Sequence, residues 1–166
     1  MKAMSIMNYE LVIRAKKRFN FIPKDLRYFD DHFVCRGMSE TWEVPPAVEN
    51  GKSYPVPDFV LWMLRAPLVS ERAKDCLSGL CEADVEFLPF HKAKGKNIYA
   101  MNVLSTDSKR AVFKQTPKSV VLVDERFGAI MRDNRLTGAE LADPNDDVDR
   151  KVAMGETVNA FPGLYC

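Results

Sequence analysis

The chain has 166 residues, enough to bury a sizeable core in one domain without disulfide or metal support. Hydrophobic residues make up 46% of it and charged residues 28%, which is typical of a soluble globular protein. The 24 lysines and arginines against 23 aspartates and glutamates leave a net charge of +1, which argues against broad nucleic-acid binding because displacing counterions from phosphates requires excess basic charge.

The first residues lack the pattern of an export signal. After Lys2 the apolar stretch covers only residues 3–7, whereas an export segment has an apolar core of about 7–15 residues. The longest apolar run, residues 59–64, is far shorter than the roughly 18 residues that a membrane span requires. The four cysteines do not indicate a disulfide framework in a chain of this size. We therefore expect a soluble, cytoplasmic protein with no membrane partner.

The N-terminal third predicts two strands and one short helical segment. Alternation of Tyr9, Leu11 and Ile13 with more polar neighbours indicates a half-buried strand. The stretch KDLRYFDD, residues 24–31, is typical of a short helix or a turn. The stretch HFVCR, residues 32–36, predicts a second strand.

Residues 44–57 predict a long surface loop. They contain four of the ten prolines, and proline lacks the backbone donor that ladders and helix interiors need. Such a loop is either a passive connector or a place where binding residues gather. Trp42 precedes the loop among polar residues, where it either anchors a partner or covers the edge of the core.

A buried apolar segment and a capped helix follow the loop. Residues 58–69 predict one or two buried strands. Ser70 then stands at a helix N-cap, and Glu71 lies in the first turn, where the helix dipole favours a negative charge. The predicted apolar stripe consists of Ala73, Cys76, Leu77 and Leu80. Gly79 predicts the end of this helix.

A second unit repeats this order of elements. Strands around Val85 and over residues 98–104, joined by a turn at Gly95, separate the two units. Residues 119–123 then predict a buried strand, and Asp124 takes the cap position. The second apolar stripe consists of Phe127, Ile130 and Met131. The stretch LTG is predicted to close this helix, with Gly138 free to adopt positive φ, and a final short strand follows it.

These elements predict an α+β fold, with a mixed β-sheet and two capped helices on one face. The two units are either a strand–helix–strand pseudo-repeat or two uses of a common strand-to-helix arrangement. We expect one domain over residues 1–166. It comprises N-terminal strands and the proline-rich loop (1–56), a core (57–142) and an irregular tail (143–166) with a short helix near residues 148–154.

Three short motifs are incomplete. The stretch PAVENGKS, residues 46–53, has proline where a phosphate-binding loop has its first glycine. The acidic stretch from Asp143 lacks the glycine and the final glutamate of a calcium loop. His32, Cys35, Cys76 and Cys81 do not have zinc-ligand spacing. We therefore expect no cofactor, no metal and no catalytic residue.

Segments of the core resemble a family of bacterial immunity proteins of polymorphic toxin systems. The similarity lies in PDFVLWML, LVSERAKDCL, VEFLPF, IYAMNVL and VVLVDERFGAIMRDNRLTGAEL. It covers roughly residues 57–142. The positions that fall on the family pattern are Asp58, Phe59, Ser70, Glu71, Arg72, Phe87, Pro89, Tyr99, Asn102, Leu136, Thr137 and Gly138. Asp124 replaces the more usual serine at the start of the later helix, which preserves capping.

The resemblance implies a protein that neutralises a cognate toxin by direct binding, without catalysis. Its motifs define the fold and do not carry the toxin-facing surface. As candidate partner-binding residues we take Trp42, Tyr54 and Arg65, because aromatic and arginine side chains supply most of the binding energy at interfaces.

Two alternatives stay open. The first is a small enzyme or ligand-binding domain with a site near the proline-rich loop or around His91, Asp58 and Arg65. The second is a structural subunit or homo-oligomer, because the exposed edges of an open sheet can pair between chains.

Overall fold

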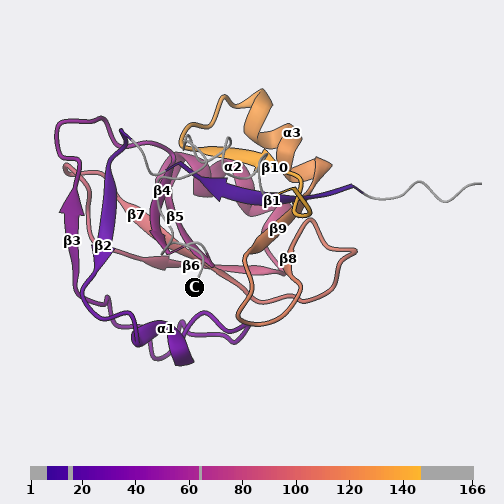
Figure 1. Ribbon diagram of the computed structural model, residues 1–166, viewed down its shortest axis with the longest axis horizontal. Helices are drawn as coiled ribbons and strands as arrows, with labels where there is room; N and C mark the ends of the chain where they lie inside the picture. The colour runs from indigo at the N-terminus through magenta and orange to yellow at the C-terminus, as the bar shows by residue number, and fades with distance from the viewer. Residues whose placement is uncertain (1–6, 15–16, 64, 147–166) are drawn as a thin grey trace, which may run out of the picture.

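The structure, a computed structural model, describes residues 7–14, 17–63 and 65–146 (Figure 1). Within these residues the chain forms three helices and ten strands. The helices are α1 (Tyr28–Asp31), α2 (Glu71–Cys81) and α3 (Glu125–Asp133). The strands are β1 (Asn8–Ile13), β2 (Asn20–Pro23), β3 (Ala47–Asn50), β4 (Phe59–Met63), β5 (Ala66–Ser70), β6 (Val85–Pro89), β7 (Ile98–Val103), β8 (Val112–Lys114), β9 (Val121–Asp124) and β10 (Ala139–Ala142).

The predicted α+β class is confirmed, and the strands form two sheets where the sequence suggested one. Among the described residues, one sheet has the order β10-β1-β9-β8 and is antiparallel. The other has the order β3-β2-β4-β5-β7-β6 and is mixed, because β2 and β4 run parallel. The separate four-stranded sheet arises because β1 pairs with β9 and β10, which are far away in the sequence. That central position also buries β1 more deeply than the half-buried strand we predicted.

Both predicted units have the strand–helix–strand order. In the sheet, a strand that is not part of the unit lies between the two strands of each unit. In the first unit β5, α2 and β6 follow one another, and β7 lies between β5 and β6. In the second unit β9, α3 and β10 follow one another, and β1 lies between β9 and β10. The flanking strands of each unit are antiparallel to the enclosed one and hence parallel to each other. The shared topology supports the pseudo-repeat as a description of the architecture.

Both N-caps lie where the sequence predicts them. The Ser70 hydroxyl accepts a hydrogen bond from the Ala73 amide at 3.1 Å at the start of α2. The Asp124 carboxylate accepts bonds from the amides of Arg126 and Phe127 at 2.9 and 3.3 Å at the start of α3. The predicted stripes face the core, with their most buried members at Ala73, Leu77, Phe127 and Met131. α2 ends at Cys81, two residues past Gly79, so Gly79 lies in the last turn as predicted.

Asp124→Ala should lower the free energy of unfolding by about 1–2 kcal/mol, because two amides at the start of α3 would lose their acceptor. Asp124→Ser should lower it by clearly less, since serine caps α2 in the same way at Ser70. Urea denaturation of the two variants measures the difference. Equal losses for alanine and serine would show that the ion pair between Asp124 and Arg126, at 2.7 Å, matters more than the cap.

The hydrophobic residues form two cores on opposite faces of the six-stranded sheet. The first core joins both sheets to α2 and α3, with side chains such as Ile13, Phe59 and Phe127. The second core is rich in aromatic rings and lies beneath the N-terminal segment that includes α1. Figure 1 shows α1 on the opposite side of the molecule from α3. The aromatic members of the second core are Phe19, Phe21, Phe29, Phe33, Trp62 and Phe90.

The prediction of a strand at HFVCR is wrong. Phe33 and Cys35 both have φ of 58°, which is incompatible with an extended strand. Phe33 is instead fully buried in the second core, where its ring packs against Trp62 with centroids 5.6 Å apart. A long-range contact therefore outweighs the local alternation of apolar residues.

Three strands were not predicted. β2, β3 and β8 have four residues or fewer, and β3 lies inside the proline-rich segment that we expected to be a loop. The predicted helix near residues 148–154 lies outside the described residues. In the part of the chain that the structure describes, no helix has the length and apolar character needed to cross a bilayer.

Candidate functional site

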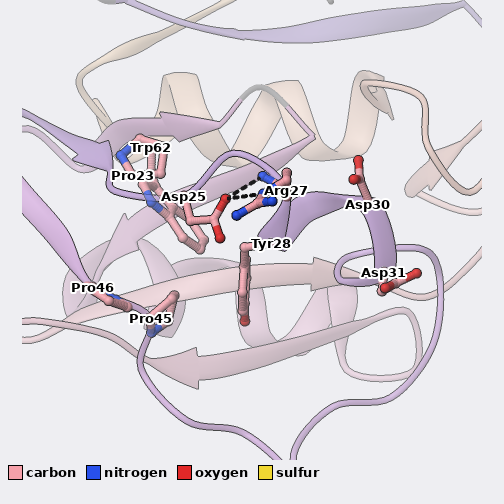
Figure 2. Close-up of a pocket in the computed structure, with 9 residues that line it drawn as sticks. All are labelled: Pro23, Asp25, Arg27, Tyr28, Asp30, Asp31, Pro45, Pro46 and Trp62. Carbon is pink, nitrogen blue, oxygen red and sulfur yellow. Dashed lines mark hydrogen bonds and ion pairs between the residues drawn. The ribbon is translucent and has the colours of Figure 1, made fainter.

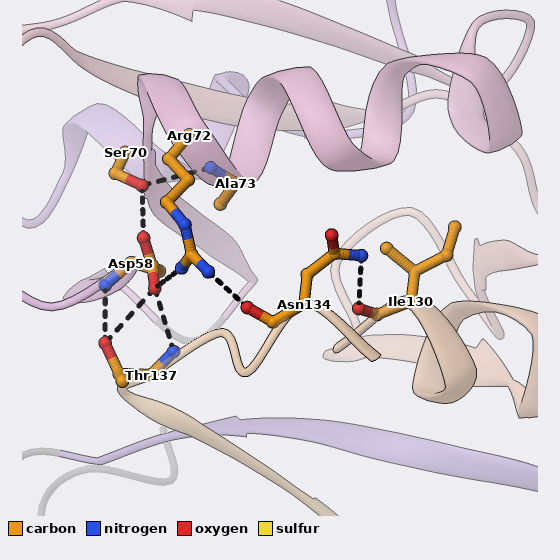
Figure 3. Close-up of polar contacts among 7 residues, drawn as sticks. All are labelled: Asp58, Ser70, Arg72, Ala73, Ile130, Asn134 and Thr137. Atoms are coloured by element: carbon orange, nitrogen blue, oxygen red, sulfur yellow. Dashed lines mark hydrogen bonds and ion pairs between the residues drawn. The ribbon is translucent and has the colours of Figure 1, made fainter. Parts of the chain in front are cut away.

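Asp58 is the centre of a polar network that joins the two units (Figure 3). Its Oδ1 accepts a hydrogen bond from the Ser70 hydroxyl at 2.8 Å. Its Oδ2 accepts bonds from Arg72 Nη1 at 2.8 Å and from the Thr137 amide at 3.0 Å. Only 9% of Asp58 is exposed. The carboxylate thus links the segment before β4, the start of α2 and the turn before β10.

Backbone contacts reinforce this network. The Ser70 amide donates to the Asp58 carbonyl at 2.7 Å, and the Phe59 amide donates to the Thr137 carbonyl at 2.9 Å. Gly138 has a φ of 93°, and a Cβ atom there would overlap the Phe59 carbonyl. Gly138 therefore allows its backbone to lie close to that of Phe59 at the entry to β10. It does not close α3, which ends at Asp133, five residues earlier.

Arg72 extends the network to the second long helix. Its Nη2 donates to the carbonyl of Asn134, the residue after α3, and the Asn134 side chain donates to the Ile130 carbonyl at 2.9 Å (Figure 3). The residues that carry the family resemblance around Asp58 thus bind one another. Their contacts assign them to the frame of the fold.

A second network fixes the N-terminal segment to the six-stranded sheet. Asn102 on β7 is fully buried, and its amide donates to Glu86 on β6 at 2.9 Å and to the Arg36 carbonyl at 2.7 Å. Glu86 also accepts a bond from the Met38 amide at 2.8 Å. Although burial opposes it, this hydrogen bonding holds the pKa of Glu86 below its usual value. Asn102, another resemblance position, is likewise structural.

Lys114 on β8 is fully buried. Its Nζ donates to the carbonyl of Phe33, a residue with positive φ, at 2.8 Å. Burial lowers the pKa of Lys114 to about 8. The contact ties the N-terminal segment to the four-stranded sheet at an electrostatic cost.

An open groove of about 560 Å³ lies beside α1 (Figure 2). Its lining comes from the end of β2, the segment leading into α1, α1 itself, the residues before β3, and β4. The lining residues are Pro23, Asp25, Arg27, Tyr28, Asp30, Asp31, Pro45, Pro46 and Trp62. The groove combines proline and aromatic surfaces with three carboxylates and one arginine.

Several groove residues are held in place by their neighbours. The Tyr28 ring stacks on His32 with centroids 3.9 Å apart, and burial raises the pKa of Tyr28 to about 12. His91 Nε2 donates to the Pro45 carbonyl at 2.8 Å. Arg27 pairs with Asp25 at 3.4 Å. Asp30 and Asp31 remain exposed and supply the negative charge of the groove.

The three candidate partner-binding residues occupy different environments. Trp42 is half-buried, donates from Nε1 to the Pro89 carbonyl at 2.6 Å and packs on Phe33. Arg65 is half-buried over the Phe29 ring, 5.9 Å from its centroid, and donates to the Phe29 carbonyl. Tyr54 is 37% exposed. Tyr54 is thus accessible at the surface, whereas Trp42 and Arg65 make contacts that hold the second core together.

The residues proposed for an enzyme-like site bind separate structural partners. His91 contacts Pro45, Asp58 lies in its own network, and Arg65 contacts Phe29. The structure does not join the three by any hydrogen bond or ion pair among the described residues. No cluster of three or more metal-ligating side chains occurs in the described part of the chain.

Sequence reasoning did not find the groove. Its residues come from three separate stretches of the chain, residues 23–31, residues 45–46 and Trp62, and the sequence predicted only a short helix or a turn at α1. The one available signal was the pair of carboxylates Asp30 and Asp31 close to the proline-rich loop, which includes Pro45 and Pro46. No family model matches the chain, and no curated protein matches it.

Proposed function

We propose that this protein is a non-catalytic, cytoplasmic immunity protein that neutralises a cognate toxin by direct binding. The observation that carries the proposal is the placement of the resemblance residues. Asp58, Ser70, Arg72, Thr137 and Gly138 form an internal frame. A binding protein needs such a stiff frame, because a pre-organised surface loses little entropy on association.

The groove beside α1 is the surface that we assign to the toxin. Its walls are fixed by stacking and hydrogen bonds, and it combines apolar surface with a few charges, as expected of an interface centre. Asp30 and Asp31 give it local negative charge on a chain of net charge +1. We therefore expect the bound part of the toxin to be basic.

Charge reversal at the groove tests this assignment. The chain is co-expressed with the product of the adjacent reading frame, and the complex is isolated by affinity chromatography. We expect the double variant Asp30→Lys, Asp31→Lys to weaken association by at least about ten-fold. The matched control is Glu82→Lys with Asp133→Lys, which reverses two exposed charges at the ends of α2 and α3.

The outcomes distinguish the proposed function from the proposed binding surface. If the groove variant loses binding and the control variant keeps it, both proposals are supported. Equal binding by the wild type and both variants places the contact elsewhere. A neighbouring product that is harmless to cells and never associates with the chain overturns the proposed function.

A further inference from the structure

β3 is one of the two edge strands of the six-stranded sheet, and among the described residues it pairs on one side, with β2 (Figure 1). The register places Ile22 opposite Val48 and Pro23 opposite Ala47. Edge strands are surfaces to which another strand can add, so proteins usually protect them with charge or cover. The position of β3 therefore raises the question of what its outer side binds.

The ladder fixes which backbone groups of β3 point outward. The Lys24 amide donates to the Pro46 carbonyl at 3.2 Å, one step beyond the strands. Hydrogen-bonded pairs alternate in an antiparallel ladder, so Ile22 and Val48 form the next hydrogen-bonded pair. Pro23, which has no amide hydrogen, correctly falls in a pair without hydrogen bonds. Ala47 and Glu49 therefore direct their amide and carbonyl groups away from β2.

The side chains next to this edge are apolar and accessible. Ile22 is 51% exposed and Val48 is 48% exposed, and both lie on one face because they are directly paired. Phe21, the neighbour of Ile22, points to the opposite face and belongs to the second core. The exposed pair thus lies on the face opposite the second core, the face on which α2 packs against β5 and β7.

We propose that two copies of this chain associate through β3, antiparallel and about a two-fold axis at Val48. In this register Ala47 of each copy exchanges hydrogen bonds with Glu49 of the other, using the outward backbone groups. Val48 then faces Val48 of the second copy, and Ile22 of both copies extends the apolar contact. The two six-stranded sheets become one continuous sheet.

Charge and register both favour a second copy over an unrelated strand. Shifting the register by two residues in one direction would place Glu49 of one copy opposite Glu49 of the other. Shifting it by two residues in the other direction would place Glu49 opposite Pro45 of the other copy, which has no amide hydrogen. Exposed Glu43 precedes β3 and exposed Lys52 follows it. Antiparallel pairing brings the acidic flank of one copy toward the basic flank of the other, which is the complementarity that a self-associating surface requires.

Sedimentation velocity of the purified chain tests the proposal without any toxin. We expect the mass to rise with concentration from 18.9 kDa toward about twice that value. Glu49→Pro should keep the protein at the monomer mass, because it removes an outward amide and leaves the hydrogen bonds to β2 intact. Glu49→Ala is the matched control and should dimerise like the wild type.

A second variant is needed because Glu49→Pro could fail to fold. Val48→Lys keeps the backbone and opposes two positive charges across the axis, so it should also remain monomeric, with the melting temperature that the wild type shows at concentrations where it is monomeric. A wild-type chain that is monomeric at every concentration overturns the proposal. A dimer that persists in both Glu49→Pro and Val48→Lys also overturns it, because the contact then lies elsewhere.

Discussion

Asp58→Ala lowers the free energy of unfolding by about 3–5 kcal/mol in our expectation, one of the two largest effects that the structure indicates. The substitution removes a buried carboxylate that accepts bonds from the Ser70 hydroxyl, the Arg72 guanidinium and the Thr137 amide. The donors left behind lose their acceptor, and a buried unsatisfied donor costs about 1–3 kcal/mol. Urea denaturation followed by circular dichroism measures the loss.

Arg72→Ala is the matched control for this loss. The Arg72 side chain is 54% exposed, so its ion pair with Asp58 is screened by water and should contribute no more than about 1 kcal/mol. The asymmetry between the two partners is the diagnostic result. Equal small losses from Asp58→Ala and Arg72→Ala would show that the network is a surface ion pair and not the frame of the fold.

Lys114→Met should raise the free energy of unfolding at pH 7 by about 2 kcal/mol. Burial lowers the pKa of Lys114 from 10.5 to about 8, a shift equivalent to about 3 kcal/mol of cost for keeping the charged form inside. Methionine fills a similar volume without that charge. The gain is reduced by about 1 kcal/mol because the Phe33 carbonyl loses its donor.

The pH dependence of the stability difference between Lys114→Met and the wild type shows whether the buried charge causes it. Between pH 8 and 10.5 the unfolded chain holds the Lys114 proton more tightly than the folded one, so the stability contribution of Lys114 rises with pH in that range. The advantage of Lys114→Met should therefore shrink by about 3 kcal/mol from pH 7 to about pH 10.5. A constant difference between the variant and the wild type across this range would contradict a charged, buried Lys114.

The comparison with the variant is needed because another buried group titrates in the same range. Burial, assisted by nearby Asp84 and Asp124, raises the pKa of Cys81 to about 12. Unfolding frees that thiol to ionise, so its contribution to stability falls as the pH rises above its unfolded pKa of about 9. Lys114→Met leaves Cys81 unchanged, and the difference between the two proteins isolates the lysine.

Local signals in the sequence predicted the regular part of the fold. Ser70 and Asp124 marked the helix starts because a capping side chain satisfies amides within three residues of itself. The stripes of α2 and α3 followed from helical spacing, and β4, β5, β7 and β9 followed from long apolar runs. Each of these features depends on neighbours in the chain, so one sequence was sufficient.

Contacts between distant segments could not be predicted in the same way. Thr137 reaches Asp58 across 79 positions, and Lys114 reaches Phe33 across 81. The resemblance drew attention to Asp58 and Thr137 but not to the bond between them. The residues around Phe33 alternate as in a strand, yet Phe33 has positive φ and packs its ring against Trp62. The groove was missed for the same reason, since its walls come from separate segments.

The candidate partner-binding residues show how residue type alone falls short. Trp42 and Arg65 have the side chains that dominate interfaces, and both are occupied by contacts within the second core. Tyr54 retains an exposed ring. Substituting Tyr54 therefore probes a surface contact, whereas substituting either of the others would also disturb the fold.

The proposed neutralisation by binding is tested most directly by a titration of the product of the adjacent reading frame, the toxin that the proposal requires. Purified chain is added in increments, and the residual toxin activity is measured after a fixed time. Binding predicts that activity falls in proportion to added chain and ends at one equivalent, whatever the incubation time. Inactivation by far less than one equivalent, growing with time, would reveal turnover and contradict the account.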